Sequence, residues 1–142
     1  MQLKADRLYQ EILLSHARRP CCRDEIAAPS VSRFARNPLC GDDVRLQARW
    51  SGAVLAEIGC KVQGCSILTA SASILCSMCE GRSRCELQQL CRDVLAMLGN
   101  QGGQALEALG EAKALAEVCA FPSRLRCAGL PWEVMAECLA EP

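Results

Sequence analysis

The sequence predicts an α+β fold, in which a small three-stranded antiparallel sheet packs against several helices. Residues 43–50 and 54–62 alternate apolar and polar side chains, and the Ser51-Gly52 turn between them is typical of a hairpin. The segments before and after this hairpin instead repeat apolar residues at helical spacing. One helix, then strands, then helices is the order of an α+β domain, which we expect to span residues 1–142.

The first half of the chain is expected to lead from one helix into the sheet. The helix is predicted over residues 4–18, with Asp6 as its N-cap and Pro20 just beyond its end. Residues 20–30 contain two prolines and predict a loop. Residues 31–37 then predict an edge strand, which adds a third strand to the hairpin.

The second half of the chain is expected to be helical, with breaks that contain glycine or proline. The expected helices cover residues 65–81, 84–98, 104–119 and about 128–140. Gly81 is a natural stop for the first of them, and Gly110 is a weak point that divides the third into two short pieces. Pro131 is tolerated because it is predicted to lie in the first turn of the last helix.

Composition and charge exclude several classes of function. Lys+Arg and Asp+Glu both number 16, so the formal net charge is zero, and aromatic residues make up only 4%. A chain without a cationic field and with few stacking rings is not expected to bind nucleic acid or an anionic membrane. The N-terminal MQLKADRLYQ lacks the apolar region of a signal peptide, and no apolar run is long enough to span a bilayer. These features predict a cytoplasmic protein.

Twelve cysteines are many for a chain of this size in a reducing compartment, where thiols pack in cores or bind metals. Four occupy apolar positions of predicted strands and helices and are expected to pack in the core: Cys60, Cys91, Cys119 and Cys138. Cys76 and Cys79 form C-S-M-C in an apolar helical run without a second CxxC. Core packing is therefore the first interpretation of this pair, and a redox or auxiliary metal pair is the alternative. The loop pair Cys21-Cys22 is expected to be exposed, and Cys85 fits no pattern.

Three further cysteines occupy positions that suit metal ligands. In NPLCGDD, Gly41 can take backbone angles that let Cys40 and Asp42 point to the same centre. Cys65 and Cys127 begin predicted helices, where the partial positive charge of the helix favours thiolates. Three thiolates and a carboxylate form a suitable set for tetrahedral zinc. Unrelated buried thiols beside an ordinary turn aspartate remain the alternative.

The charge of this ligand set has two consequences. Three thiolates and one carboxylate leave a net charge of about −2 around Zn²⁺, and Arg124 and Arg126 are close enough in the chain to offset it. Because of the carboxylate, the ligand atoms are not all sulfur, unlike those of a closed structural site of four cysteines. We therefore expect a ligand that exchanges, so that a thiolate is released to react.

Three motifs, in this order, resemble the cysteine motifs of the U-type iron–sulfur scaffold family, which includes IscU, SufU and the N-terminal part of NifU: NPLCGDD, GCSILTASASI and FPSRLRCAGLPW. LYQEILLSHARRP resembles the opening helix of the family, and its His16 is expected to be structural. The long stretch between Cys65 and Cys127 resembles the SufU branch, as does Arg126 where IscU has a histidine.

The resemblance implies a SufU/IscU-like fold and a zinc-dependent sulfurtransferase component that works with a SufS-type cysteine desulfurase. It implies four zinc ligands: Cys40, Asp42, Cys65 and Cys127. Cys40 would take the persulfide sulfur after a desulfurase side chain replaces it on the zinc, and Arg124 resembles a family arginine near that exchange. Downstream iron–sulfur assembly proteins are further expected partners.

The sequence is also compatible with two other functions. The first is a scaffold that builds a [2Fe–2S] cluster, or holds iron, on the same four ligands. The second is a non-catalytic protein that binds the desulfurase and regulates it, and whose metal only stabilises the fold. The absence of a ligand histidine and the long insertion favour the zinc-dependent sulfur acceptor over the scaffold.

Overall fold

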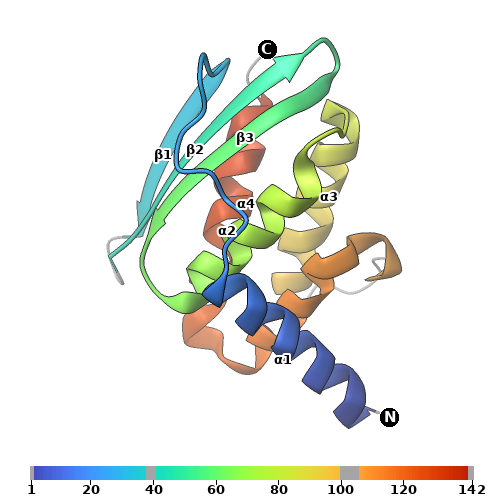
Figure 1. The fold of residues 1–142 in the computed structure, drawn as a ribbon. Coiled ribbons are helices and arrows are strands. Elements are labelled where there is room, and N and C mark those ends of the chain that lie inside the picture. Colours follow the sequence, from blue (N-terminus) through green and yellow to red (C-terminus); the bar gives the residue numbers. More distant parts are fainter. Residues whose placement is uncertain (1, 38–40, 100–105, 141–142) are drawn as a thin grey trace.

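The computed structural model describes residues 2–37, 41–99 and 106–140 and has the predicted α+β architecture (Figure 1). In chain order its helices and strands are α1 (Gln2–Arg18), β1 (Val31–Asn37), β2 (Asp42–Ser51), β3 (Val54–Gln63), α2 (Ser66–Cys79), α3 (Arg84–Leu98), the 3₁₀ helices η1 (Leu106–Ala120) and η2 (Pro122–Arg124), and α4 (Leu125–Ala140). The predicted three-stranded antiparallel sheet with several helices is therefore confirmed.

The sheet has the order β1-β2-β3, with β2 in the centre and both neighbouring pairs antiparallel. On β2, Val44, Leu46 and Ala48 are fully buried, whereas Arg45 is exposed. The helices cover one face of the sheet (Figure 1), so every second side chain of β2 points into the core. The alternation in the sequence thus predicted this strand correctly.

The helices form layers beside the covered face of the sheet. α2 and α4 contact the strands, α3 packs on α4 and η1, and α1 packs across α2 and η1. Within the described part of the chain, no helix combines the length and apolar composition needed to cross a membrane.

α2 is buried around most of its circumference, because residues 70–76 are all buried. The small side chain of Ser71 lets α4 come close. Its hydroxyl donates to the carbonyl of Ala128, and the indole N–H of Trp132 donates to Ser71 Oγ at 2.9 Å. Trp132 is fully buried, so this polar connection between α2 and α4 lies inside the core.

His16 is buried and connects three helices, which agrees with the structural role expected for it. With Nε2 protonated, it donates to Glu111 Oε2 at 2.9 Å and accepts at Nδ1 from the Ser73 hydroxyl at 2.6 Å. Ser73 Oγ also accepts from the backbone N–H of Cys21 at 2.8 Å. Ser73, His16 and Glu111 form a serine–histidine–glutamate chain of hydrogen bonds. Ser73 is nevertheless fully buried and has no access to a substrate. The network therefore fixes α1 and the following loop onto α2.

Several helix boundaries follow the predicted signals, and two do not. Ser83 and Glu86 form a capping box at the start of α3, and Gly110 interrupts η1 with a non-helical φ of 55°. Asp6 is not an N-cap, because α1 already begins at Gln2. The prediction that Pro131 lies in the first turn of the last helix is also wrong, because η2 leads directly into α4 at Leu125. Both errors arise because the helices begin before the local sequence signals.

Candidate metal centre

Three of the four predicted ligands converge on one point in the fold. The ligand atoms of Asp42, Cys65 and Cys127 all lie within 4.8 Å of one another. They come from the first residue of β2, the residue before α2 and the first turn of α4. Cys40, the fourth predicted ligand and the predicted sulfur acceptor, lies outside the described residues. The three described donors are far apart in the chain, so the packing of α2 and α4 on the sheet creates this cluster.

The position of Asp42 depends on the glycine before it. Gly41 has a φ of 74°, as the sequence predicted, and an added Cβ would meet no atom within 4 Å. The backbone angle, and not the available space, therefore requires glycine here. The N–H of Gly41 donates to the carbonyl of Asn37 at 2.9 Å, and Asn37 is the ladder partner of Asp42. These contacts place the Asp42 side chain at the buried end of the sheet, where it is 1% exposed.

Gly64 is a second requirement for this geometry. A Cβ at Gly64 would lie 2.9 Å from Asp42 Cγ and 2.7 Å from Leu68 Cδ2, closer than side chains tolerate. The carboxylate of Asp42 therefore packs directly on the backbone that joins β3 to α2. In the sequence, Gly64 marks only the point where the pattern changes from strand to helix. Its position directly before a candidate ligand was the available signal.

Both thiols lie at the N-terminal ends of helices. Cys65 is the N-cap of α2, with extended backbone angles and no side-chain capping hydrogen bond. Its thiol is half-buried, whereas Cys127 in the first turn of α4 is 1% exposed. The partial positive charge at a helix N-terminus stabilises a thiolate in such positions. The two helix dipoles therefore favour anionic ligands at this centre.

The described donors fit a zinc ion. Asp42 Oδ2 is buried and has no hydrogen-bond partner within the described ranges, a costly arrangement for a carboxylate that a bound cation would resolve. Burial raises the pKa of Cys127, and its hydrogen bonds with Asp42 and Cys65 raise it further, because an anionic thiolate there would face other acidic groups. Two sulfurs and a carboxylate oxygen are suitable zinc donors, and iron accepts the same atoms.

The two arginines before Cys127 lie outside the buried cluster. Arg124 is exposed at the end of η2, and Arg126 is exposed on α4. Arg126 lines a shallow hollow of about 150 Å³, whose other lining residues are Arg36, Asn37, Leu130 and Glu133. Both guanidinium groups are thus available to solvent and to a docked partner.

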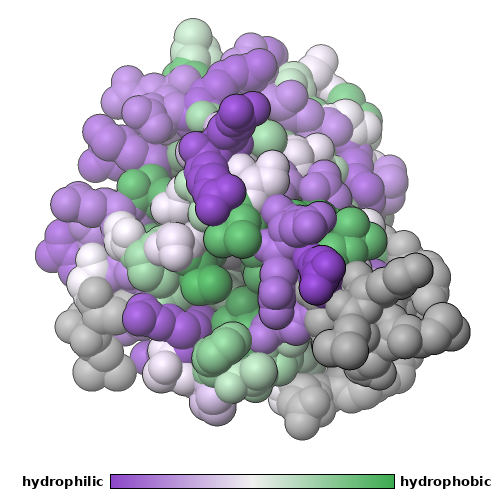
Figure 2. All heavy atoms as spheres, turned by 60° about the horizontal axis from the view of Figure 1, so that its bottom comes forward, coloured by the Kyte–Doolittle hydropathy of each residue, from purple (hydrophilic) through white to green (hydrophobic). Residues whose placement is uncertain are grey.

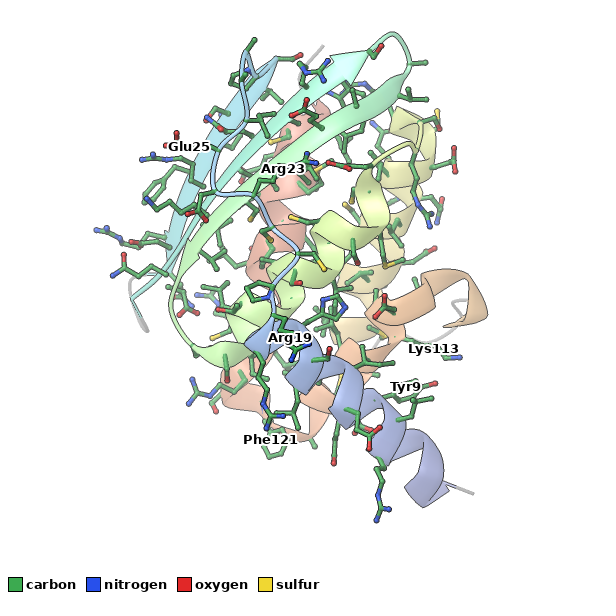
Figure 3. The ribbon with its side chains drawn as sticks, in the orientation of Figure 1. Tyr9, Arg19, Arg23, Glu25, Lys113 and Phe121 are labelled. Atoms are coloured by element: carbon green, nitrogen blue, oxygen red, sulfur yellow. The ribbon has the colours of Figure 1, made fainter. Side chains whose placement is uncertain are left out.

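The end of the molecule at which α4 begins has a mixed surface. Figure 2 shows hydrophobic side chains gathered in the middle of this face, with hydrophilic side chains around them. Phe121, next to η2, is 62% exposed and projects from this end of the molecule in Figure 3. An apolar area with a polar rim is typical of a protein-binding surface.

The other cysteines divide largely as predicted. Cys60, Cys91 and Cys138 are buried in the core, whereas Cys119 is only half-buried. Both members of C-S-M-C are buried, Cys79 completely and Cys76 at 6% exposure. In the loop, Cys21 is exposed as expected. The prediction that Cys22 is exposed is wrong: it is half-buried because the loop is hydrogen-bonded to α2 and β3, and its contact with Cys76 was not predicted.

Comparisons with known proteins agree on one family. The family model described as NifU-like N terminal domain matches residues 8–128. An iron–sulfur cluster assembly scaffold protein IscU from Streptococcus pyogenes serotype M1 is 30% identical over 136 residues, which cover 96% of this chain and 85% of the relative. A zinc-dependent sulfurtransferase SufU from Bacillus subtilis (strain 168) is 28% identical over 139 residues, covering 96% and 92%. The crystal structure of the N-terminal part of a nitrogen-fixing NifU-like protein from Brucella abortus shares the fold, with a TM-score of 0.84 at 21% identity. That similarity covers 95% of this chain and 94% of the NifU-like chain.

Proposed function

Because the chain belongs to the NifU-like N terminal domain family of iron–sulfur cluster assembly scaffolds, we propose that it accepts persulfide sulfur from a SufS-type cysteine desulfurase at a zinc site. The buried cluster of Asp42, Cys65 and Cys127, with its unpaired carboxylate oxygen, carries the proposal. The relative named as a zinc-dependent sulfurtransferase, similar along 96% of this chain, supports the choice of zinc and of sulfur transfer.

In this proposal, four residues hold the ion: Cys40, Asp42, Cys65 and Cys127. When bound, zinc would keep its cysteine ligands ionised at neutral pH. Asp42 is the fixed ligand, because the β1–β2 ladder and the close contact with Gly64 hold its carboxylate in place. Cys40 stands two residues earlier, next to the glycine of positive φ, and is the ligand that leaves.

The proposed transfer is a thiolate–persulfide exchange. The Cys40 thiolate attacks the outer sulfur of the desulfurase persulfide and forms a new S–S bond. The original S–S bond breaks, and its electron pair leaves with the desulfurase cysteine as a thiolate. The terminal sulfur keeps its proton, so Cys40 carries a persulfide and no external oxidant or reductant is needed.

Arg124 is proposed to assist this exchange from the surface. Its exposed guanidinium lies one residue before the start of α4, on the approach to Cys127. A cation in this position offsets the net negative charge of the ligand set while Cys40 is detached. Exposed Phe121 and the apolar area in Figure 2 are the proposed contact surface for the desulfurase.

The second candidate function is assembly of a [2Fe–2S] cluster on the same donors. It is favoured by the relative named as an iron–sulfur cluster assembly scaffold, at 30% identity. Thiolates with one oxygen ligand accept iron as well as zinc. The protein would then deliver a cluster, rather than a sulfur atom, to downstream assembly proteins.

A single anaerobic preparation separates these candidates. The sulfur-acceptor proposal predicts about one zinc ion per chain, no visible absorption, and stimulation of a SufS-type desulfurase that Cys40→Ala abolishes. Cys85→Ala is the matched control, because Cys85 is an exposed thiol on α3 and should keep full stimulation. Metal analysis, the visible spectrum and the rate of sulfide or alanine release are the readouts.

Two results would contradict the proposal in different ways. Charge-transfer bands from a reconstituted cluster that passes to an apo-protein would support the scaffold. Desulfurase stimulation that survives Cys40→Ala would instead support a regulator that binds the desulfurase without accepting its sulfur.

A further inference from the structure

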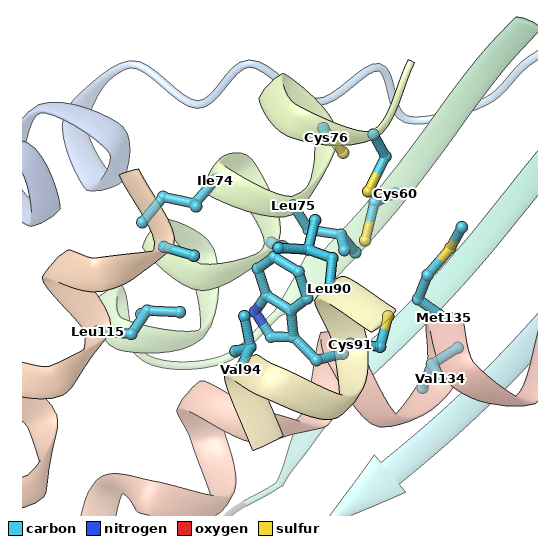
Figure 4. Packing of buried hydrophobic residues seen from close by; sticks show 14 of the residues in the cluster. Cys60, Ile74, Leu75, Cys76, Leu90, Cys91, Val94, Leu115, Val134 and Met135 are labelled. Atoms are coloured by element: carbon cyan, nitrogen blue, oxygen red, sulfur yellow. The ribbon is translucent and has the colours of Figure 1, made fainter. Parts of the chain in front are cut away.

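A second group of thiols lies away from the candidate metal centre. The Cys76 thiol on α2 donates to Cys22 Sγ at 3.0 Å, and Cys60 on β3 lies beside both. Figure 4 shows Cys60 and Cys76 in the same part of the core. Cys65 begins α2 and Cys76 follows eleven residues later, so the two sites are separated by about 16 Å along the helix.

The backbone on both sides of Cys22 is held against the core. The N–H of Cys21 donates to Ser73 Oγ on α2, and the carbonyl of Arg23 accepts from the N–H of Cys60 on β3 at 2.7 Å. Figure 3 shows the segment that carries Arg23 crossing beside β3. Cys22 is therefore fixed between α2 and β3, with its thiol half-buried and directed at Cys76.

The two sulfurs differ in acidity. Hydrogen bonds from Cys60 and Cys76 lower the pKa of Cys22 to about 4, against the opposing effects of burial and Asp24. The same contacts raise the pKa of Cys60 and of Cys76. Cys22 is therefore the more acidic of the two sulfurs, and Cys76 is the one that keeps its proton. This is the arrangement of an attacking and a resolving cysteine.

We propose that Cys22 and Cys76 form a redox-active dithiol that reacts with hydrogen peroxide and closes to a disulfide. The Cys22 thiolate attacks one peroxide oxygen, the O–O bond breaks, and the released hydroxide takes a proton to become water. Cys22 is then a sulfenic acid. Cys76 attacks Cys22 Sγ, and its proton leaves with the hydroxyl group as a second water. Two thiols are oxidised, and one peroxide is reduced to two waters.

The geometry suits a small oxidant and an internal disulfide. Cys22 is only half-exposed, which admits peroxide more readily than a bulky disulfide. A disulfide bond is about 2.05 Å long, so the sulfurs need to approach by about 1 Å from their 3.0 Å separation. Cys60, at 1% exposure, has much less access to solvent and serves as a hydrogen-bond donor to Cys22.

Non-reducing peptide mapping tests this proposal on the full chain. Reduced protein is treated with hydrogen peroxide, free thiols are blocked with N-ethylmaleimide, and cross-linked peptides are located by mass spectrometry. The Cys22–Cys76 link is expected in the wild type and in Cys21→Ser, the matched control that leaves one cysteine in the loop peptide. It should disappear in Cys22→Ser and in Cys76→Ala. A link through Cys21 or Cys60, or no internal link, would overturn the proposal.

A second measurement needs no variant and is independent of the stability of any substitution. The rate of Cys22 alkylation by iodoacetamide is expected to stay nearly constant from pH 8 to about pH 5, because the thiolate is already formed. N-acetylcysteine in the same buffers should instead lose about tenfold per pH unit below its own pKa. If the rate at Cys22 falls in parallel with that of N-acetylcysteine, Cys22 is not the attacking thiolate.

Discussion

Replacement of Cys127 by alanine is expected to weaken zinc binding by more than about 100-fold. Loss of even an outer partner of a metal ligand commonly costs 10–100-fold in affinity, and Cys127 is proposed as a direct ligand. The substitution leaves Asp42 and Cys65 with one donor fewer in a buried cluster. Competition with a chromogenic zinc chelator measures the affinity.

Cys138→Ala is the matched control for this variant, since Cys138 is also a buried thiol on α4, at 1% exposure. It should keep wild-type affinity even where it loses stability. Gly64→Ala gives a graded comparison. It retains every proposed ligand but displaces the Asp42 carboxylate, so we expect an affinity between those of Cys127→Ala and the wild type. Equal affinity of Cys127→Ala and Cys138→Ala would remove Cys127 from the ligand set.

Trp132→Ala is expected to lower the free energy of unfolding by about 3–5 kcal/mol, which is the usual cost of removing a large buried aromatic side chain. Trp132 is fully buried, and its indole N–H donates to Ser71 Oγ at the contact between α2 and α4. The variant leaves a cavity and removes one hydrogen bond to a buried hydroxyl. Urea unfolding, followed by circular dichroism with zinc kept in excess, measures the loss.

The other tryptophan provides the control for Trp132. Trp50 is half-buried at the end of β2, and the guanidinium of Arg84 lies 4.3 Å from its ring centroid. A cation–π contact at a partly exposed position contributes about 0.5–2 kcal/mol, so Trp50→Ala should cost clearly less. Equal losses for the two variants would mean that the α2–α4 contact is not the centre of the core.

The sequence predicted the sheet well because the alternation of apolar and polar residues follows directly from a sheet that is covered on one face. β2 has one covered face, so alternation alone identifies its buried residues, such as Val44 and Leu46. The start of α3 was also predictable, because Ser83 and Glu86 cap it locally. The 3₁₀ character of η1 was not, since alanine-rich sequence favours an α-helix and tertiary packing decides otherwise.

The candidate site was only partly predictable. Gly41 and the helix starts identified Asp42, Cys65 and Cys127 as ligand types, but sequence spacing cannot show that distant residues meet. The Cys22–Cys76 contact escaped prediction for the same reason, since tertiary hydrogen bonds hold that loop against α2 and β3.

The location of the transferred sulfur is the most direct test of the proposed function. The protein is incubated anaerobically with a SufS-type desulfurase and cysteine, alkylated, and digested with trypsin. Cleavage after Arg36 and Arg45 releases residues 37–45, whose only cysteine is Cys40. We predict that this peptide gains the mass of one sulfur atom and loses that gain when the desulfurase is omitted. An unmodified 37–45 peptide, with the extra sulfur on another cysteine or on none, would contradict the account.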